Sequence, residues 1–349
     1  MRKIIILLFI ITVQDCSSYI PRKEISEKFF GKKFQIIAHR GMRNYAPENS
    51  MSAFRMAHSR GFPFELDVMF CRTGELVVFH DETVDRVTGK KGKVADLSLS
   101  ELKALDSLVY FRSEFRERIS SYSEEELREL ALAGLLYKKT YQRDWSRMKK
   151  SDFISVSDNN FLYDSFKGEK IPLLEEVLDE FGGKALIDIE IKSFELGEKA
   201  RKVAAATAEL IRKKNLVGKV FVTSFNPYVL EETARIEPDL IRGQLYSSFK
   251  DITQMPYIAK VLLRNLYFLN NAKPEVLALG KEMAVREYVQ EKKDLGFILF
   301  PWTVNDPEEM KNLIENGVDG LITDRPELAE KVYKKYIREK GAVSFSGVR

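Results

Sequence analysis

Histidine is rare in this sequence, and its placement suggests proton-transfer chemistry. Only three of the 349 residues are histidines. His39 ends the apolar run 36–39, and His80 ends the apolar run 76–80. An imidazole exchanges its proton near neutral pH, so two of them at strand ends are suited to general acid–base catalysis. His58 differs, because it falls on the apolar stripe of a predicted helix, where side chains more often pack than react.

Carboxylates alternate with apolar residues in two other runs. Glu65 and Asp67 are two positions apart on a predicted strand, so they share one face. Glu190 and Lys192 repeat this spacing in a later run. A buried carboxylate without a partner is costly, and the simplest compensation is a cation. Oxygen ligands favour Mg²⁺ or Ca²⁺ over Zn²⁺, whereas internal ion pairing of Glu190 with Lys192 or Arg40 is the alternative.

A short turn between the second and third predicted strands brings the acids and the second histidine together. The sequence of residues 72–75, Arg-Thr-Gly-Glu, predicts a hairpin with a two-residue loop, in which Arg72 opposes Glu75. The same ladder sets Asp67 opposite His80. The acid pair and this histidine then share one face, and a slip of one residue would destroy that agreement.

Two cationic side chains complete the set. Arg40 follows the first histidine, and Lys192 lies beside the last acid. Both can neutralise the non-bridging oxygens of a phosphate, and arginine can do so with two parallel hydrogen bonds. Cleavage of a phosphodiester requires charge stabilisation, a deprotonated nucleophile and a protonated leaving group. Residue types and spacing alone therefore indicate a metal-assisted hydrolase or lyase.

The elements that must position these residues alternate along most of the chain. Strands that are apolar on both faces are typical of a parallel sheet covered by helices, and about eight β-then-α repeats predict an α/β fold of the TIM (β/α)8 barrel class. In such a barrel the carboxyl ends of the strands form the active-site rim, which is where both histidines fall. The expected strands are 34–39, 62–68, 75–80, 185–191, 220–224, 241–246, 276–279, 297–302 and 320–323. The expected helices include 49–59, 99–105, 173–181, 196–214, 228–236 and 307–316.

One long stretch interrupts this alternation. Residues 108–167 are helix-like, charged and aromatic, which predicts a helical insertion over one end of the barrel. Residues 257–269 are apolar and aromatic at helical spacing. Either segment is suited to cover the active site or to touch lipid, and packing of a helix against the barrel is the alternative.

The first sixteen residues differ from the rest. Arg2 and Lys3 precede a mostly apolar run, 4–13, which is too short to cross a bilayer because crossing takes about 20 residues. This pattern is typical of a secretory signal peptide, so we expect an exported, periplasmic or membrane-anchored bacterial protein. Cys16 stands where bacterial lipoproteins carry their lipidated cysteine, although Asp15 replaces the usual small residue. An ordinary signal peptide cleaved a few residues later is the alternative.

Composition limits the remaining possibilities. We expect residues 17–33 to form a polar linker, residues 34–335 the barrel and residues 336–349 a tail. The sequence is 44% hydrophobic and 31% charged, which argues against long disorder. A net charge of +4, with bases scattered among acids, argues against a nucleic-acid partner. The only cysteine besides Cys16 is Cys71, so a disulfide framework is excluded and Cys71 is expected to be small, buried and apolar in role.

The motifs that contain these residues resemble those of the glycerophosphodiester phosphodiesterase family. Three of them carry both histidines, Arg40 and the first acid pair, namely Ala38-His39-Arg40-Gly41, Glu65-Leu66-Asp67-Val68 and Val77-Val78-Phe79-His80-Asp81. The others agree with the family in order: Pro47-Glu48-Asn49-Ser50, Ile171-Pro172-Leu173-Leu174, Ile189-Glu190-Ile191-Lys192, Thr223-Ser224-Phe225, Trp302-Thr303-Val304-Asn305 and Gly320-Leu321-Ile322-Thr323-Asp324. Together they cover most of the chain, and so many motifs in one order are specific.

The resemblance implies a TIM barrel, a divalent cation and hydrolysis of glycerophosphodiesters to glycerol 3-phosphate and an alcohol. It implies that the substrate's own glycerol hydroxyl attacks first and that water then opens a cyclic phosphate. By position, the acids look like metal ligands, the histidines like the acid–base pair, and the two cations like phosphate contacts. These residues are Glu65, Asp67 and Glu190 for the metal, His39 and His80 for catalysis, and Arg40 and Lys192 for the phosphate.

Two further positions match the family with open roles. Glu48 matches a position near the metal, and the alternative is that it orients Arg40 while Asn49 caps the first barrel helix. Trp302 is expected to line the substrate site, with a structural aromatic as the alternative. The insertion departs most from the family pattern and leaves the choice of substrate open.

Three functions therefore compete. The first is a glycerophosphodiesterase acting on soluble, deacylated phospholipids. The second is a phospholipase D-type enzyme acting on lysophospholipids or sphingolipids, which an apolar trough in the insertion would favour. The third is a catalytically weak barrel that serves as a surface binding protein. The intact set of catalytic residues argues against the third.

Overall fold

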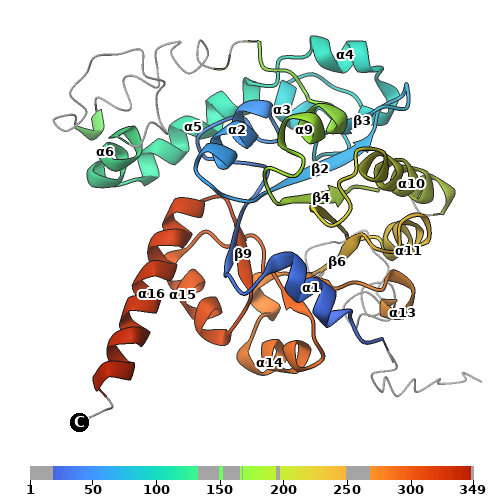
Figure 1. The fold of residues 1–349 in the computed structure, drawn as a ribbon. Coiled ribbons are helices and arrows are strands. Elements are labelled where there is room, and N and C mark those ends of the chain that lie inside the picture. The colour runs from blue at the N-terminus through green and yellow to red at the C-terminus, as the bar shows by residue number, and fades with distance from the viewer. Residues whose placement is uncertain are drawn as a thin grey trace, which may run out of the picture.

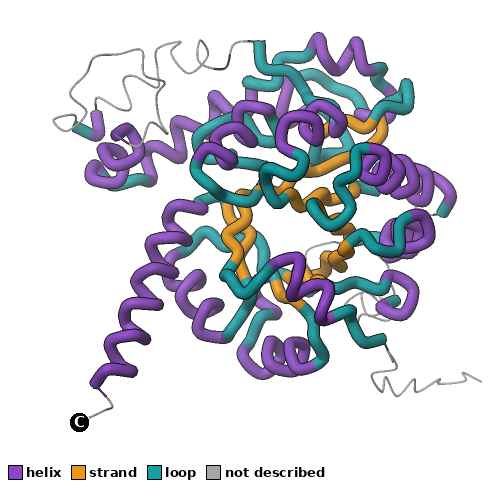
Figure 2. Tube along the Cα trace, viewed as in Figure 1, coloured by secondary structure: helices purple, strands orange, loops and turns teal. Residues whose placement is uncertain are grey.

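The computed structural model describes residues 19–132, 149–151, 166, 168–193, 197–248 and 268–346. Within these ranges, eight parallel strands form a ring, and the TIM (β/α)8 barrel predicted from the sequence is confirmed (Figures 1 and 2). Figure 2 shows the strands in the centre with helices around them. The parallel strands are β1 (Gln35–Ala38), β2 (Phe64–Phe70), β4 (Ile187–Ile191), β5 (Val220–Ser224), β6 (Ile241–Tyr246), β7 (Val276–Leu279), β8 (Ile298–Leu299) and β9 (Gly320–Thr323).

The ring runs in the order β8-β7-β6-β5-β4-β2-β1-β9 and is closed between its two ends by backbone hydrogen bonds. The amide of Asp319 donates to the carbonyl of Leu299 at 3.1 Å, and the amide of Ile322 donates to that of Pro301 at 3.0 Å. Closure leaves the ring of described strands without an edge that could pair with another chain. It also fixes every strand end at one rim, which is the condition for assembling a site from distant parts of the sequence.

Helices cover the outside of the ring, and four of the described helices begin at a side chain that caps them. Ser50, Ser98, Asn226 and Asp306 each accept a hydrogen bond from a backbone amide of the following first turn. No described helix is both long enough and apolar enough to cross a membrane. The helices with described bounds are α1 (Lys23–Phe30), α2 (Met51–Ser59), α3 (Asp85–Thr88), α4 (Leu99–Ala104), α5 (Val109–Ser121), α6 (Glu124–Leu132), α9 (Leu174–Phe181), α10 (Glu198–Lys213), α11 (Pro227–Ile236), α13 (Leu269–Ala272), α14 (Arg286–Asp294), α15 (Pro307–Asn316) and α16 (Pro326–Ser346).

The barrel interior below the rim is apolar. Its largest members, Phe221 and Phe300, are fully buried, and Phe30 of α1 contacts both from beneath at 5.2 Å between ring centres. Burying a side chain of this size contributes roughly 1.5–3 kcal/mol. The cluster contains Phe30, Ile37, Phe221, Ile241, Val276, Phe300 and Ile322.

Two predicted boundaries are corrected by the structure. Residues 17–33 are not merely a linker, because α1 lies within them and closes the lower end of the barrel through Phe30. Residues 336–349 do not begin as a separate tail, because α16 continues through position 336 as one helix. Of the predicted insertion, 108–167, the structure describes α5 and α6, while most of the rest lies outside the described residues, as do nearly all of 257–269 and all of 1–16.

The predicted hairpin exists, but its register was wrong by one residue. Strand β3 (Leu76–Val78) runs antiparallel to β2, with Val68 opposite Val78. The loop has three residues instead of two, because the amide of Cys71 donates to the carbonyl of Glu75 at 3.1 Å. Gly74 adopts a φ of 91°, the left-handed conformation that a three-residue hairpin loop requires. Phe79, and not His80, is therefore beside Asp67.

Candidate active site

A cavity of about 110 Å³ opens at the carboxyl ends of the barrel strands. Both predicted catalytic histidines line it, and so do most of the predicted ligands, although the hairpin register differed from expectation. His80 reaches the cavity because β3 ends at Val78 and the chain leaves the ladder before position 80. The lining residues are His39, Arg40, Glu65, His80, Asp188, Glu190, Lys192, Thr223, Phe225, Leu245, Trp302, Thr303 and Ile322.

The predicted acid cluster is assembled by two neighbouring strands. Parallel pairing of β2 with β4 sets Asp67 beside Glu190 and Glu65 beside Asp188. One carboxylate oxygen from each of Glu65, Asp67 and Glu190 lies within 4.8 Å of the others. The exposed fractions of these three residues are only 3%, 0% and 9%. Four acids therefore meet in the barrel mouth, where their charges are poorly screened by water.

This crowding leaves Glu65 in need of a positive charge. One of its oxygens accepts a hydrogen bond from the amide of Arg40 at 2.8 Å, whereas Oε1 is buried without a hydrogen-bond partner. Burial, and then the charges of Asp67 and Glu190, raise the pKa of Glu65 well above its usual range. An unsatisfied buried carboxylate oxygen inside an all-oxygen cluster fits a hard divalent cation. The residues present are thus compatible with the predicted metal.

Two cationic side chains also reach the cluster. Lys192 Nζ lies 2.6 Å from Glu190 and 3.1 Å from Asp67, and Arg40 Nε lies 3.3 Å from Asp67. Burial alone would raise the pKa of Asp67, but Lys192, followed by His80 and Arg40, holds it below its usual range. The ion pairing considered from the sequence is therefore present. It does not extend to Glu65, for which no ion pair occurs among the described residues.

Each of the two predicted catalytic histidines is held by an aspartate through Nδ1. His39 Nδ1 lies 2.8 Å from Asp324 Oδ1, and His80 Nδ1 lies 2.6 Å from Asp81 Oδ1. Asn305 fixes the first pair by donating to Asp324 Oδ2 at 2.7 Å. Because Nδ1 is engaged in both rings, Nε2 is the nitrogen left for chemistry. Burial, and then the charge of Arg40, lower the pKa of His39, which favours its neutral form.

Glu48 is a shared acceptor for three arginines. Arg86 donates to its two oxygens at 2.7 and 2.9 Å, Arg40 donates at 2.8 Å, and Arg43 donates at 3.3 Å. Burial alone would raise the pKa of Glu48, but these guanidinium groups, Arg86 first, lower it to about 2. The predicted contact that orients Arg40 is therefore present. Glu48 lies behind the cavity and is not among its lining residues.

Asn49 has a different task from the one predicted. It does not cap α2, because Ser50 accepts the hydrogen bond from the amide of Ala53. Asn49 instead adopts a φ of 54°, and its side-chain amide donates to Asp67 Oδ2 at 2.8 Å while accepting from the Asp67 amide at 3.2 Å. Asparagine tolerates the left-handed conformation better than most residues, which is the signal that sequence reasoning overlooked.

The rim opposite the acids is aromatic. Trp302 lines the cavity, as predicted, and its indole N–H donates to the carbonyl of Ala278 at 2.9 Å. The ring meets Phe225 edge to face at 5.4 Å. Trp302 thus lines the cavity and also packs, so both roles considered for it are combined. His58 and Cys71 lie apart from the site: His58 contacts the ring of Phe181, and Cys71 is buried in an apolar cluster, as expected for both.

Sequence reasoning assigned no role to four polar residues of the site. Asp81 and Asp324 are the last residues of two motifs, and each lies within hydrogen-bonding distance of a predicted catalytic histidine. Asp188 shares the face of Glu190 and accepts from the Thr223 hydroxyl at 2.8 Å. Asn305, the fourth, is the last residue of the motif that begins at Trp302, and it donates to Asp324. For Asp81, the signal available in the sequence was a carboxylate directly after a strand-end histidine.

The barrel and its rim define a class of protein, TIM-barrel hydrolases with acid–base groups around a carboxylate cluster. The chain matches the model of the glycerophosphoryl diester phosphodiesterase family over residues 39–328. It is 30% identical over 309 residues to a glycerophosphodiester phosphodiesterase of Caldanaerobacter subterraneus subsp. tengcongensis, which covers 87% of this chain and 99% of the relative. This chain belongs to the glycerophosphoryl diester phosphodiesterase family, as its motifs predicted.

Further comparisons agree with this assignment. A glycerophosphodiester phosphodiesterase of Bacillus subtilis is 28% identical over 304 residues, 86% of each chain. The structure of an Oleispira antarctica phosphodiesterase in complex with the product sn-glycerol-3-phosphate aligns with a TM-score of 0.61 and 21% identity, over 86% of this chain and 96% of the other. At that identity the structural match supports the fold alone.

Proposed function

We propose that this protein hydrolyses glycerophosphodiesters to glycerol 3-phosphate and an alcohol, using a divalent cation and the pair His39 and His80. The observation that carries the proposal is the convergence of two aspartate-bound imidazoles on one cavity beside a carboxylate cluster with an unsatisfied oxygen. Glu65, Asp67 and Glu190 would hold the cation, which would be Mg²⁺ or Ca²⁺. The family and its named relatives support the substrate class.

The side chains of this protein divide the work of the reaction. Arg40 and Lys192 bind the non-bridging oxygens of the phosphate and offset their charge. His39, whose neutral form is favoured by burial, removes the proton from the attacking hydroxyl, and His80 donates a proton to the departing alcohol as its P–O bond breaks. The attacking hydroxyl is the substrate's own or that of water. A bound cation supplies further charge stabilisation at the phosphate.

A product assay tests this proposal directly. Glycerophosphocholine should yield glycerol 3-phosphate and choline, whereas lysophosphatidylcholine should react poorly. A preference for lysophosphatidylcholine would instead support the phospholipase D-type alternative. Absence of turnover with either substrate, in folded protein supplied with Mg²⁺ or Ca²⁺, would support the surface binding protein.

Metal dependence is tested by removal and replacement. EDTA should abolish activity, because it removes the cation whose positive charge offsets the crowded acids and would stabilise the phosphate. Mg²⁺ or Ca²⁺ should restore it. Restoration by Zn²⁺ alone would contradict the preference of an all-oxygen ligand set for hard cations.

We also propose that the protein is exported and anchored to a membrane through a lipid on Cys16. The support is the charged start and short apolar run that precede this cysteine. Labelling with radioactive palmitate should mark the chain that begins at Cys16 and should fail with Cys16→Ala. Cleavage a few residues beyond position 16, read by N-terminal sequencing, would instead indicate an ordinary signal peptide.

A further inference from the structure

The described chain begins beneath the barrel, at the end opposite the active site. Arg22 Nε lies 2.6 Å from Glu275, at the start of β7, and Arg22 also donates to the carbonyl of Pro238 at 2.8 Å. The ring of Tyr19 contacts Phe297, directly before β8, at 6.4 Å. Figure 1 shows α1, in blue, crossing in front of the ring of strands. The segment 19–30 is therefore a fixed part of this lower end.

Exposed apolar side chains gather on the same end. Ile20 is 72% exposed, and Ile25 and Leu295 are each 43% exposed. Gly296, the neighbour of Leu295, closely approaches this segment, because a Cβ at that position would be 3.2 Å from the Cβ of Lys23 and 3.5 Å from Pro21. Seven large apolar side chains are exposed among the described residues, and three of them come from this end of the barrel. A concentration of this kind marks a binding surface more often than chance.

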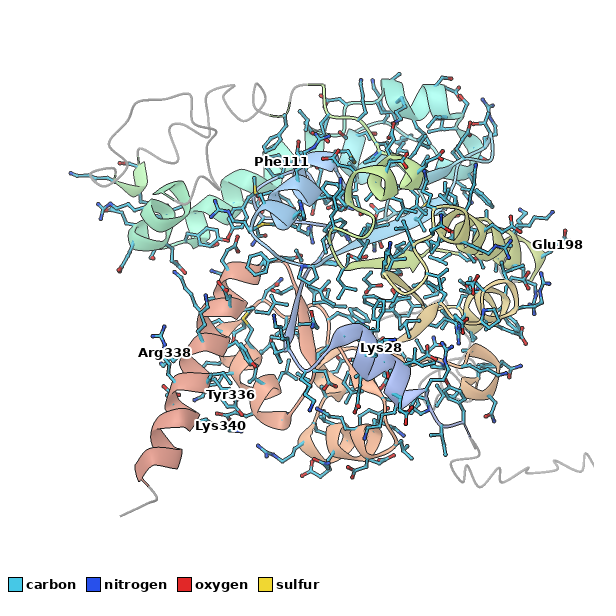
Figure 3. All side chains as sticks on the ribbon, in the orientation of Figure 1. Lys28, Phe111, Glu198, Tyr336, Arg338 and Lys340 are labelled. Carbon is cyan, nitrogen blue, oxygen red and sulfur yellow. The ribbon has the colours of Figure 1, made fainter. Side chains whose placement is uncertain are left out.

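Four lysines stand on segments of the same end of the barrel. Lys28 lies on α1, as Figure 3 shows, Lys32 and Lys33 precede β1, and Lys219 precedes β5. All four are exposed, and none has a carboxylate partner among the described residues. The acids of this end are partly neutralised locally: Glu27 pairs with Lys23, Asp239 and Glu275 pair with Arg22, and Asp319 pairs with Lys293. The four lysines leave positive charge on this end, which Glu24 and Asp294, without an ion-pair partner among the described residues, offset in part.

The chain that precedes this surface bears on what covers it. Cys16 is three residues before Tyr19, a length of chain of at most roughly 11 Å because each residue spans at most about 3.6 Å. Apolar side chains together with lysines complement an anionic bilayer, where the apolar groups enter the interface and the lysines meet lipid phosphates. A lipid on Cys16 would hold the same surface at the membrane.

We propose that the lower end of the barrel, comprising Ile20, Ile25, Leu295 and the four lysines, docks on an anionic membrane surface. The active-site cavity, at the opposite end of the strands, then faces the aqueous side. The orientation rests on the proposed membrane location of the chain but not on its catalytic activity. It favours substrates that arrive in solution over lipids still embedded in the same bilayer.

Tryptophan fluorescence in vesicles tests the orientation. The full chain carrying Leu295→Trp is bound to phosphatidylcholine–phosphatidylglycerol vesicles with brominated acyl chains, which quench tryptophan at the interface. The matched control is Tyr228→Trp, because Tyr228 is 38% exposed and starts α11 at the active-site end. The two native tryptophans are common to both variants, so the unsubstituted chain provides the baseline. We expect the quenching gained over this baseline to be at least about twofold larger for Leu295→Trp than for Tyr228→Trp. Equal quenching, stronger quenching at position 228 or failure to bind vesicles would overturn the proposal.

A charge reversal tests the lysines in the same assay. Lys32→Glu with Lys33→Glu, added to Leu295→Trp, should reduce quenching by at least about half as electrostatic attraction is lost. Lys90→Glu with Lys91→Glu is the control, because it is the same dipeptide in an exposed loop near Arg86, on the active-site side. An equal loss in both would contradict the proposal. Thermal unfolding by circular dichroism verifies folding independently of turnover.

Discussion

The two histidine–aspartate pairs face one cavity but are built in different ways. His39 and Asp324 are 285 positions apart and come from the ends of the adjacent strands β1 and β9, where Ala38 pairs with Thr323. Their side chains are 16% and 14% exposed. His80 and Asp81 are consecutive in sequence, lie beyond the end of β3, and are 31% and 24% exposed. One pair is part of the barrel framework, and the other is a local feature of the rim.

This difference suggests how acid and base are kept apart. Burial, and then Arg40, lower the pKa of His39, so the framework imidazole is suited to accept a proton at neutral pH. The rim pair has access to water, from which His80 can regain the proton that it donates. Two groups of one residue type thus acquire different roles from their surroundings.

Removing either imidazole should have the largest effect. We expect His39→Ala and His80→Ala each to lower kcat by at least about a hundredfold, the usual scale for an acid–base group. Steady-state turnover of glycerophosphocholine measures this. His58→Ala is the matched control and should retain activity, because His58 is exposed on α2 and contacts Phe181 outside the site. Full activity in both site variants would refute the assignment.

Removing the orienting carboxylates should separate the two pairs. We expect Asp324→Asn to lower kcat by about a hundredfold and Asp81→Asn by about tenfold, the range reported for groups that orient a functional histidine. The buried pair depends more on its partner, because water can replace a lost hydrogen bond at the rim. Measured kcat values in the reverse order would show that burial does not decide the contribution.

The acid limb of the pH profile should identify the framework pair. Activity should fall as pH drops through the lowered pKa of His39, because the protonated ring no longer accepts a proton. Asp324 raises this pKa, so Asp324→Asn should move the limb of kcat/KM to lower pH. Asp81→Asn should leave this limb in place. A shift to higher pH in Asp324→Asn would contradict the electrostatic account.

The smallest expected effect is on stability. Burial alone would raise the pKa of Asp324, but the hydrogen bond and charge of His39 lower it below the ordinary value of 3.8. Asp324 therefore stabilises the fold above that pH, and the contribution is lost as pH falls through the lowered pKa. Asp324→Asn should cost on the order of 1 kcal/mol at pH 7 and less in acid, measured by urea unfolding. A cost independent of pH would show that the charge is not involved.

The barrel could be predicted from the sequence because its evidence is local. Apolar runs on both faces marked the strands, and two-residue spacing placed Glu65 and Asp67 on one face. The hairpin register could not be read, because Arg-Thr-Gly-Glu fits a two-residue loop as well as a three-residue one. Only the hydrogen bond from Cys71 to Glu75 distinguishes them. Register depends on turn geometry, which residue types constrain weakly.

What could not be predicted depends on contacts between distant residues. Asp324 meets His39 only because β9 pairs with β1 in the closed ring. Likewise, α1 looked like a linker in the sequence. Its role is visible only in the fold, where it places Phe30 under Phe221 and Phe300. Asn49 was read as a helix cap, whereas in the structure its left-handed backbone accompanies two hydrogen bonds with Asp67 on a distant strand. Local propensity contains none of these facts.

Arg40 illustrates how the site is prepared before any substrate arrives. Its φ of 53° is unfavourable for a side chain with a Cβ, by roughly 1 kcal/mol. Its amide is held by Glu65 and its guanidinium by Glu48, so both ends of the residue are fixed. The ordering cost of this long side chain is consequently met during folding and not during the encounter with a phosphate. Binding at this arginine should then resemble a rigid fit, with little entropy left to lose.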